Sequence, residues 1–261
     1  VVVVSNYPHD LMPLQEAKAI LFTPSGCQEL GRAIADVMSG SYNPSGRLNM
    51  TWYSSFEDLP AKNECDIIRT RQTYQYYRGK KQYPFGYGLS YTEFKVENLK
   101  IGEKEVPTDG KIEVSCSVSN TGKAAGDEVV QLYQSFHGAH VVRPNKQLSG
   151  FKRVHLKPGE TKQLMFHLDT AQLGYYNEEM EFVVEPGQLD IMVGTSSEDL
   201  PLKDTVTLTG KKNKCGRQKK LYLSGRGSIK EIMETKTVSG SIADTVFACM
   251  GDGTKSGKIL Q

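Results

Sequence analysis

Adjacent acidic side chains are the first residues in this sequence that could do chemistry, because paired carboxyl groups can act as general acid and base. The most conspicuous pairs are Glu57–Asp58 in SSFEDLP and Asp127–Glu128 in AGDEVV. Neighbouring strand residues point to opposite faces, so Asp127 and Glu128 are not expected to converge on one substrate bond. The position of Glu57 and Asp58 between SSF and LP favours a helix start or a turn. We assign neither pair to catalysis.

The histidines and cysteines have no metal-ligand spacing, since neither HxxxH, HExxH nor CxxC occurs. His137 and His140 belong to a loop-like FHGAHVVRP that could reach a neighbouring domain or a ligand, although a plain surface position is favoured. The scattered, odd-numbered cysteines favour a reducing, cytoplasmic compartment over secretion. The residues concerned are His9, His137, His140, His155 and His167, and Cys27, Cys65, Cys116, Cys215 and Cys249.

No phosphate-binding glycine loop and no serine nucleophile elbow is found, so we expect no cofactor and no metal. The formal net charge is +2, from 32 basic and 30 acidic residues, which gives no reason to expect a nucleic acid partner. A local exception is the basic run GKKNKCGRQKK at 210–220. It lacks interleaved aromatic residues, so a solvated linker is favoured over a nucleic-acid patch.

An aromatic segment lies in the middle of the chain and could contact a carbohydrate, because aromatic faces stack on sugar rings. The alternative, which we favour, is a long connector whose rings pin it against a domain surface. Gly86 and Gly88 would let the backbone turn tightly beside the rings. The aromatic residues are Tyr74, Tyr76, Tyr77, Tyr83, Phe85, Tyr87 and Tyr91.

The turn NPSG at 43–46 separates a helix-like run from a strand-like run. We expect Asn43 to bond to the backbone just ahead of it, and Gly46 to adopt a φ that other residues resist. Arg47 follows the turn and could anchor the loop to a carboxylate or bind a substrate. Anchoring is the favoured role, because guanidinium groups are common structural clamps.

The elements before this turn indicate an α/β layer. VVVV at the start resembles a buried parallel strand, and AKAILFT at 17–23 a second one. Between Cys27 and Met38 the apolar residues recur at helical spacing, with Ser25 placed to cap the helix start and Gly40 to end it. LNMTWY at 48–53 reads as the next strand. We expect the chain to begin inside an α/β sandwich whose earlier part lies upstream.

After Thr92 the sequence becomes all-β. Short alternating segments are separated by turn signals such as NTG, KPGE and EPGQ. In KIEVSCSVSN the residues Ile112, Val114, Cys116 and Val118 share one face. Seven or eight such strands predict an immunoglobulin-like sandwich of fibronectin type III kind.

Five segments resemble, in the same order, the carboxyl-terminal part of a glycoside hydrolase family 3 β-glycosidase of the β-glucosidase/β-xylosidase type. They cover roughly residues 1 to 210. The segments are ELGRAIADVMSGSYNPSGRLNMTWY, TYQYYRGKKQYPFGYGLSYTEF, SNTGKAAGDEVVQLY, RPNKQLSGFKRVHLKPGE and VEPGQLDIMVGTSS.

The resemblance implies three units in the whole protein: a triosephosphate-isomerase-type barrel, an α/β sandwich and a fibronectin type III-like domain. It also implies a retaining mechanism, with an Asp nucleophile on the barrel and a Glu acid/base on the sandwich. No segment here matches the nucleophile motif, and the acid/base loop would lie upstream of the NPSG turn. We therefore expect both catalytic carboxylates outside this chain, and no substrate-binding residue can be assigned.

We accordingly predict the end of an α/β sandwich over residues 1–60, an aromatic connector over 61–91, a fibronectin type III-like domain over 92–210, and a basic linker and helical tail over 211–261. Apolar spacing in the tail is helical at Ile229, Ile232 and Met233 and again at Ile242, Val246 and Phe247. A docking tail and a simple cover for the β-sandwich are both consistent with it. The expected partner is an oligosaccharide or aryl glycoside bound through the barrel, with a homo-oligomer left open and no membrane contact.

Three functions remain open from the sequence. The chain could be the framework part of a β-glucosidase or β-xylosidase, which is the reading we favour. It could instead be a non-catalytic carbohydrate-binding or scaffold module that uses the tyrosine-rich connector, or a cell-surface interaction domain that uses the β-sandwich alone.

Overall fold

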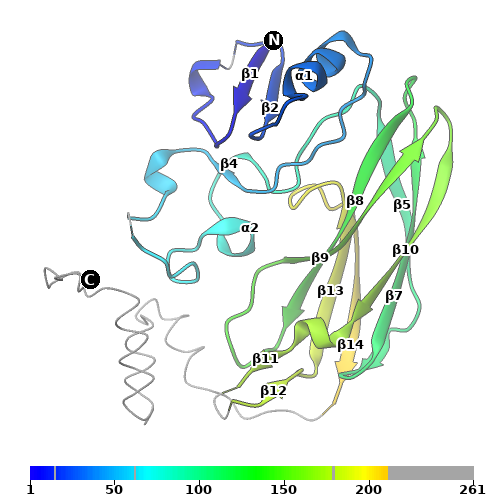
Figure 1. Ribbon diagram of the computed structural model, residues 1–261. Helices are drawn as coiled ribbons and strands as arrows, with labels where there is room; N and C mark the ends of the chain where they lie inside the picture. Colours follow the sequence, from blue (N-terminus) through cyan, green and yellow to red (C-terminus); the bar gives the residue numbers. More distant parts are fainter. Residues whose placement is uncertain (15, 62, 178–179, 211–261) are drawn as a thin grey trace, which may run out of the picture.

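The computed structural model describes residues 1–210 except residues 15, 62 and 178–179. Figure 1 shows a small α/β region at one end, an irregular middle region, and a β-sandwich that runs along one side of both. The tail and its predicted helices, most of the basic run, Cys215 and Cys249 lie outside the described residues. Among the described residues, no helix has the length and apolar character needed to span a membrane.

In the α/β region, β1 (Val2–Ser5) pairs in parallel with β2 (Ile20–Thr23), as the apolar runs predicted. The prediction that the first strand is buried was wrong, because Val1 and Val3 are 70% and 41% exposed. Parallel strands are buried when layers cover both faces, whereas β1 has one partner strand, β2, in the described part of the chain.

The helix α1 (Leu30–Ser39) begins later than expected. Ser25 does not cap it, because its Oγ donates to Asn6 Oδ1 at 2.6 Å and a turn closed by Leu30 N and Cys27 O precedes the helix. Gly40 ends the helix as predicted. Its φ of 80° is left-handed, and its N–H donates to the carbonyl of Val37.

The middle region contains short elements joined by long irregular segments. β3 (Trp52–Tyr53) pairs antiparallel with β4 (Lys81–Tyr83), so the predicted strand LNMTWY is shortened to its last two residues. The helical turns are η1 (Met12–Leu14), η2 (Phe56–Asp58) and α2 (Thr73–Tyr76).

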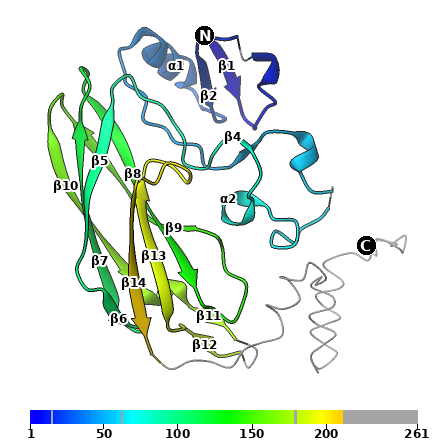
Figure 2. The same ribbon diagram turned by 180° about the vertical axis from the view of Figure 1, so that it is seen from behind.

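The β-sandwich consists of a three-stranded sheet in the order β10-β7-β5 and a five-stranded sheet in the order β6-β14-β13-β8-β9. Figures 1 and 2 show the two sheets packed face to face. The strands are β5 (Phe94–Ile101), β6 (Glu105–Pro107), β7 (Lys111–Asn120), β8 (Gly126–His137), β9 (Gln147–Leu156), β10 (Thr161–Asp169), β13 (Gly187–Gly194) and β14 (Leu202–Thr209). The helical turn η3 (Thr170–Leu173) and the hairpin β11 (Tyr175–Tyr176) and β12 (Phe182–Val183) lie between β10 and β13.

The core lies between these sheets and confirms the alternation read in β7. Ile112, Val114, Cys116 and Val118 are each at most 1% exposed. They pack in a cluster that also contains Leu132 and other residues of the facing sheet. Burial raises the pKa of the Cys116 thiol to about 11, so this thiol remains protonated at neutral pH.

Candidate functional site

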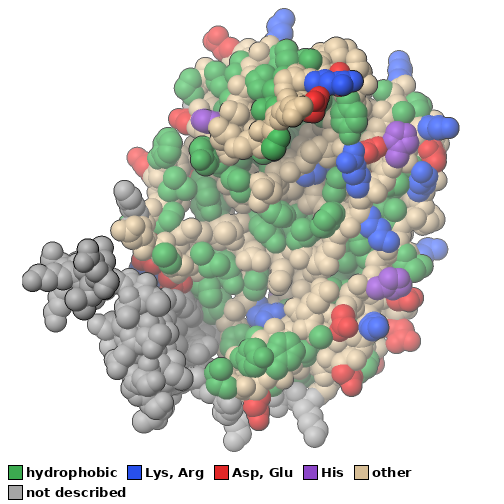
Figure 3. Space-filling model, viewed as in Figure 1, with side chains coloured by type: hydrophobic (Ala, Val, Ile, Leu, Met, Phe, Trp, Pro, Cys, Tyr) green, Lys and Arg blue, Asp and Glu red, His purple; other side chains and the backbone are tan. Residues whose placement is uncertain are grey.

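A groove of about 500 Å³ lies between the α/β region and the middle region. Figure 3 shows hydrophobic side chains gathered over this part of the surface. The loop after β1, the segment from 49 to 59, α2 and the segment after β4 form its walls. The lining residues are Pro8, His9, Asp10, Asn49, Met50, Thr51, Trp52, Tyr53, Ser54, Ser55, Phe56, Leu59, Thr73, Tyr74 and Phe85.

Trp52 fixes one wall of this groove. Its indole packs edge-on against Phe22 at 5.1 Å and Tyr83 at 5.9 Å between ring centroids, and the residue is 2% exposed. Two buried polar atoms of this wall, Thr51 Oγ1 and Trp52 Nε1, have no hydrogen-bond partner in the described chain. Buried polar atoms are normally satisfied, so these two atoms are exceptions within this wall.

The opposite wall is held by the β-sandwich through Tyr74. The Tyr74 ring stacks on Phe85 at 4.2 Å and meets Tyr133 edge-on at 6.0 Å. Its hydroxyl accepts a hydrogen bond from Leu148 N at 3.1 Å. The favoured interpretation, a connector pinned to a domain by its rings, is confirmed at this residue. Tyr74 and Phe85 also line the groove, so the rings that pin the connector form part of its wall.

Other aromatic residues of the connector pack on each other or on rings that precede the connector. Tyr83 stacks on Tyr87 at 5.1 Å, and Tyr77 meets Tyr53 edge-on at 4.7 Å. Burial, followed by a hydrogen bond to Asp58, raises the pKa of Tyr77 to about 12. Tyr91 is 55% exposed and donates to the carbonyl of Val37 in α1 at 2.8 Å.

Neither acidic pair forms a two-carboxylate site. Ser55 Oγ accepts from Glu57 N at 3.1 Å, and Ser54 donates to Asp58 at 3.1 Å, so this pair starts η2 as predicted. Glu128 is buried and points toward the α/β region. Asp127 lies on the other face of β8, where it accepts from Arg153 Nε and pairs with His155, each at 2.6 Å.

Arg47 is a structural anchor, as the sequence favoured. Its Nη2 donates to Glu128 Oε1 at 2.5 Å, and both side chains are almost fully buried. The same Glu128 oxygen accepts from Val129 N at 2.8 Å. The guanidinium of Arg47 is therefore committed to the β-sandwich rather than to a ligand.

Two details of the NPSG turn were predicted wrongly. Asn43 does not close its own turn: its amide donates to Ala125 O at 3.0 Å, and its Oδ1 accepts from Ser90 Oγ and Tyr91 N at 2.9 and 2.8 Å. Gly46 is not among the glycines with positive φ. Its carbonyl lies where a Cβ on Gly88 would come within 2.2 Å, so close packing requires glycine at 88 rather than at 46.

The loop histidines are held by carboxylates of the β-sandwich. His137 Nε2 pairs with Asp190 at 2.9 Å, while His140 bonds to the buried Glu185 through both its ring Nδ1 and its backbone N–H. Of the remaining histidines, His9 bonds to Ser5 O at 3.0 Å and His167 pairs with Glu113 at 3.6 Å. Within the described residues, no group of three or more metal-binding side chains comes together.

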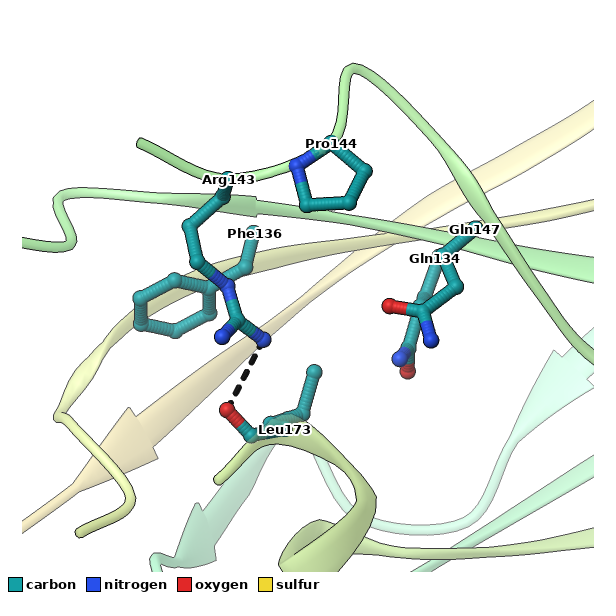
Figure 4. Close-up of a pocket in the computed structure, with 6 residues that line it drawn as sticks. All are labelled: Gln134, Phe136, Arg143, Pro144, Gln147 and Leu173. Atoms are coloured by element: carbon teal, nitrogen blue, oxygen red, sulfur yellow. Dashed lines mark hydrogen bonds between the residues drawn. The ribbon is translucent and has the colours of Figure 1, made fainter. Parts of the chain in front are cut away.

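A second, much smaller pocket of about 10 Å³ lies in the β-sandwich beside Arg143 (Figure 4). Arg143 Nη2 donates to Leu173 O at 2.8 Å across it, and Gln134 Oε1 beside it has no partner among the described residues. This volume holds about one water molecule. The groove at Trp52 is therefore the candidate site.

Sequence reasoning missed most of this groove. Asp10 and Phe56 lie outside the five family segments, and residues from 8 to 85 meet only through folding. The available signals were Tyr74 and Phe85 in the aromatic segment, and Trp52 as the sole tryptophan of the chain.

Comparison with known proteins assigns the N-terminal part of the chain and the β-sandwich to two different domain families. Residues 1–91 match the model of the glycosyl hydrolase family 3 C-terminal domain, and residues 128–197 match a fibronectin type III-like domain. The chain belongs to glycoside hydrolase family 3. This confirms the recognition made from the five ordered segments, and with it the fold class of an α/β sandwich portion followed by a fibronectin-like sandwich.

Curated members of the family align over most of this chain. A thermostable β-glucosidase B of Acetivibrio thermocellus is 38% identical over 79% of the chain and 29% of its own length. A β-xylosidase of Formosa agariphila is 40% identical over 81% of the chain and 30% of its own length. The family 3 chain thus spans about three-tenths of the length of these relatives.

Solved structures of the family superpose on the same region. A β-glucosidase from Kluyveromyces marxianus in complex with glucose has a TM-score of 0.72 and 37% identity, covering 80% of this chain and 27% of that one. A β-glucosidase from Listeria innocua in complex with isofagomine has a TM-score of 0.69 and 31% identity, covering 81% and 31%.

Proposed function

We propose that this chain is the C-terminal portion of a retaining β-glycosidase that hydrolyses terminal β-D-glucosyl or β-D-xylosyl residues of oligosaccharides. The observation that carries the proposal is the 38–40% identity, across both regions of the chain, to a family member named β-glucosidase and one named β-xylosidase. The substrate is an oligosaccharide or aryl glycoside, and the sugar preference is one outcome of the experiment below.

In this proposal the chain supplies framework rather than the catalytic carboxylates. Retaining hydrolysis needs two carboxyl groups about 5 Å apart. Asp10 is the one carboxylate among the residues that line the groove. The conspicuous pairs elsewhere are used structurally, with Glu128 held by Arg47 and Asp127 held by Arg153 and His155.

The groove supports a role beside the substrate. Its walls combine aromatic side chains such as Tyr74 and Phe85 with polar ones such as Asn49 and Ser54. Sugars combine apolar ring faces with hydroxyl groups, which fits such a lining. The same observation favours a second candidate function, a non-catalytic carbohydrate-binding module.

Hydrolysis of aryl β-glucoside and aryl β-xyloside by the purified chain separates these functions. We expect no turnover by the chain alone, and turnover after a barrel-containing portion of a family member is supplied. Turnover by the chain alone would contradict the absence of the catalytic carboxylates. No turnover in either experiment, together with saturable binding of cello- or xylo-oligosaccharides, would favour the binding module.

Two further properties belong to this proposal. The thiols of Cys27, Cys65 and Cys116 are free, and the first two are exposed, which supports a reducing, cytoplasmic location. Whether the protein is a homo-oligomer is answered by light scattering on the purified chain.

A further inference from the structure

Glu185 is a buried carboxylate that lies outside the groove. It follows β12 and precedes β13, and its side chain is 2% exposed. One carboxylate oxygen accepts from His140 N at 2.9 Å, and the other pairs with His140 Nδ1. Burial, followed by a hydrogen bond to Glu185, raises the pKa of Tyr175. Since a buried carboxylate needs hydrogen-bond donors to offset its lost hydration, these contacts hold His140 against the β-sandwich.

His140 belongs to residues 138–146, which connect β8 to β9 and which we call the β8–β9 loop. Further along this loop, Arg143 Nη2 donates to Leu173 O at 2.8 Å, as Figure 4 shows. The Arg143 guanidinium also lies over the Tyr175 ring at 5.6 Å. The first part of the β8–β9 loop is therefore attached to the β-sandwich.

The end of the β8–β9 loop is attached to α2 of the middle region. Asn145 donates twice to Gln75 O, from its backbone N at 2.7 Å and from its Nδ2 at 2.9 Å. Asn145 Oδ1 accepts from Arg78 Nε at 3.1 Å and from Arg78 Nη2 at 2.5 Å. Directly after the loop, Leu148 N donates to Tyr74 OH at 3.1 Å. The loop thus joins the contacts of Glu185 to those of α2.

The helical turn α2 forms part of one wall of the groove, since Thr73 and Tyr74 both line it. It is four residues long. Isolated helices much longer than this are already marginal in water. The position of α2 therefore depends on the segments that contact it, among them the β8–β9 loop.

We propose that Glu185 is a positioning residue for the groove. It fixes His140 and with it the β8–β9 loop, the loop fixes α2, and α2 places Tyr74 on the groove wall. Glu185 acts in this way although it is not among the residues that line the groove. The effect on sugar affinity rests on the sugar-binding role proposed for the groove above, whereas the effect on α2 does not.

Amide hydrogen exchange, followed by NMR, tests the positioning without any ligand. In Glu185→Ala we expect the N–H groups of Asn145 and Leu148, which donate to α2, to exchange about fivefold faster than in the original protein. The matched control is Glu113→Ala, which removes the carboxylate of an exposed pair with His167. This control should leave both amides unchanged. Equal exchange of these amides in Glu185→Ala and in the original protein would overturn the proposal.

The variant Glu185→Gln and the amides of β7 and β8 separate positioning from a loss of folding. A glutamine amide oxygen can still accept from His140 N, so we expect exchange at Asn145 and Leu148 to return close to that of the original protein. In Glu185→Ala the β7 and β8 amides should keep their original exchange. Faster exchange there by the same factor would assign Glu185 to overall stability and would overturn the proposal.

Titration calorimetry with a cello- or xylo-oligosaccharide gives a second readout. We expect Glu185→Ala and Asn145→Ala each to raise the dissociation constant about threefold. The double variant should bind no more weakly than either single one, because both substitutions break the same connection. Losses that multiply in the double variant would contradict a path through the β8–β9 loop. If the original protein binds neither sugar, the sugar-binding role fails, and the exchange result still decides whether Glu185 positions α2.

Discussion

Arg47, directly after the NPSG turn, and Glu128, the third residue of β8, form a buried ion pair with Nη2 and Oε1 2.5 Å apart. One partner belongs to the family 3 C-terminal domain and the other to the fibronectin-like domain. The pair therefore joins the two regions at a point where water is excluded.

Breaking this pair from one side should be costly. Glu128→Leu leaves the Arg47 charge buried and unpaired, and we expect it to lower the free energy of unfolding by about 3–5 kcal/mol. The double variant Arg47→Met/Glu128→Leu should recover much of that loss, because no unpaired charge remains. Denaturant unfolding followed by tryptophan fluorescence measures both.

The exposed pair Lys95–Glu97 is the matched control. Glu97→Leu should change the free energy of unfolding by less than about 1 kcal/mol, since exposed pairs contribute little. A Glu128→Leu protein as stable as the Glu97→Leu protein would show that the buried pair does not hold the regions together.

Gly86 should tolerate no side chain. Its φ is +81°, and a Cβ would lie 2.2 Å from Gln131 Oε1, the atom that accepts from Tyr133 OH. Gly86→Ala should therefore cost more than the ~1–2 kcal/mol of a left-handed alanine. Gly159→Ala, with a φ of +75° and no atom near its Cβ, should show that backbone cost alone. Thermal unfolding measures the loss of stability in each variant. Equal losses in Gly86→Ala and Gly159→Ala would contradict this argument.

The carboxylate of Asp190 should make stability depend on acidic pH. Burial acts to raise its pKa, but hydrogen bonds from Lys203, His137 and Thr205 outweigh burial and lower the pKa to about 2. A depressed pKa in the folded state stabilises the protein above the unfolded-state pKa of about 4. This contribution is lost as the pH falls from about 4 to 2.

Asp190→Asn should remove that pH dependence and flatten the stability curve between pH 4 and 2. The control is Asp109→Asn, which changes an exposed carboxylate in the turn between β6 and β7 and should leave the slope intact. Urea midpoints measured at half-unit pH steps give the slope. An unchanged slope in Asp190→Asn would assign the acid sensitivity to other carboxylates.

The groove at Trp52 can be tested through Phe56, which lines it and is 75% exposed. Phe56→Ser removes an aromatic surface without opening the core, so stability should change by less than about 0.5 kcal/mol. If the groove binds sugar, the dissociation constant for a cello- or xylo-oligosaccharide should rise about five- to tenfold. Titration calorimetry with Phe151→Ser, an exposed aromatic on β9, as control would reject the site if both variants bound equally.

The sequence could predict the elements whose patterns are local. Alternation in β7, the end of α1 at Gly40 and the turn role of Glu57 and Asp58 all follow from spacing and residue type, and all three are confirmed. Arg47 was also predicted correctly as an anchor, because a guanidinium directly after a turn commonly finds a carboxylate.

The partners that lie far apart in the chain could not be predicted in this way. Asn43 was expected to bond within its own turn, but its oxygen and nitrogen reach Ser90, Tyr91 and Ala125 instead. Local side-chain to backbone bonds compete with such tertiary bonds, and only the folded arrangement decides between them. The groove has the same origin, since its walls come from residues 8 to 85.

Asn43 also determines how this protein can be recombined. Its side chain joins the NPSG turn to the last residues of the connector and to Ala125 at the edge of the sandwich, alongside the Arg47–Glu128 pair. These hydrogen bonds and the ion pair fix the relative position of the two regions at their boundary. A chimera that transplants the fibronectin-like sandwich into another family member must therefore carry residues 43–47 and 86–91 with it, so that this junction is inherited as one block.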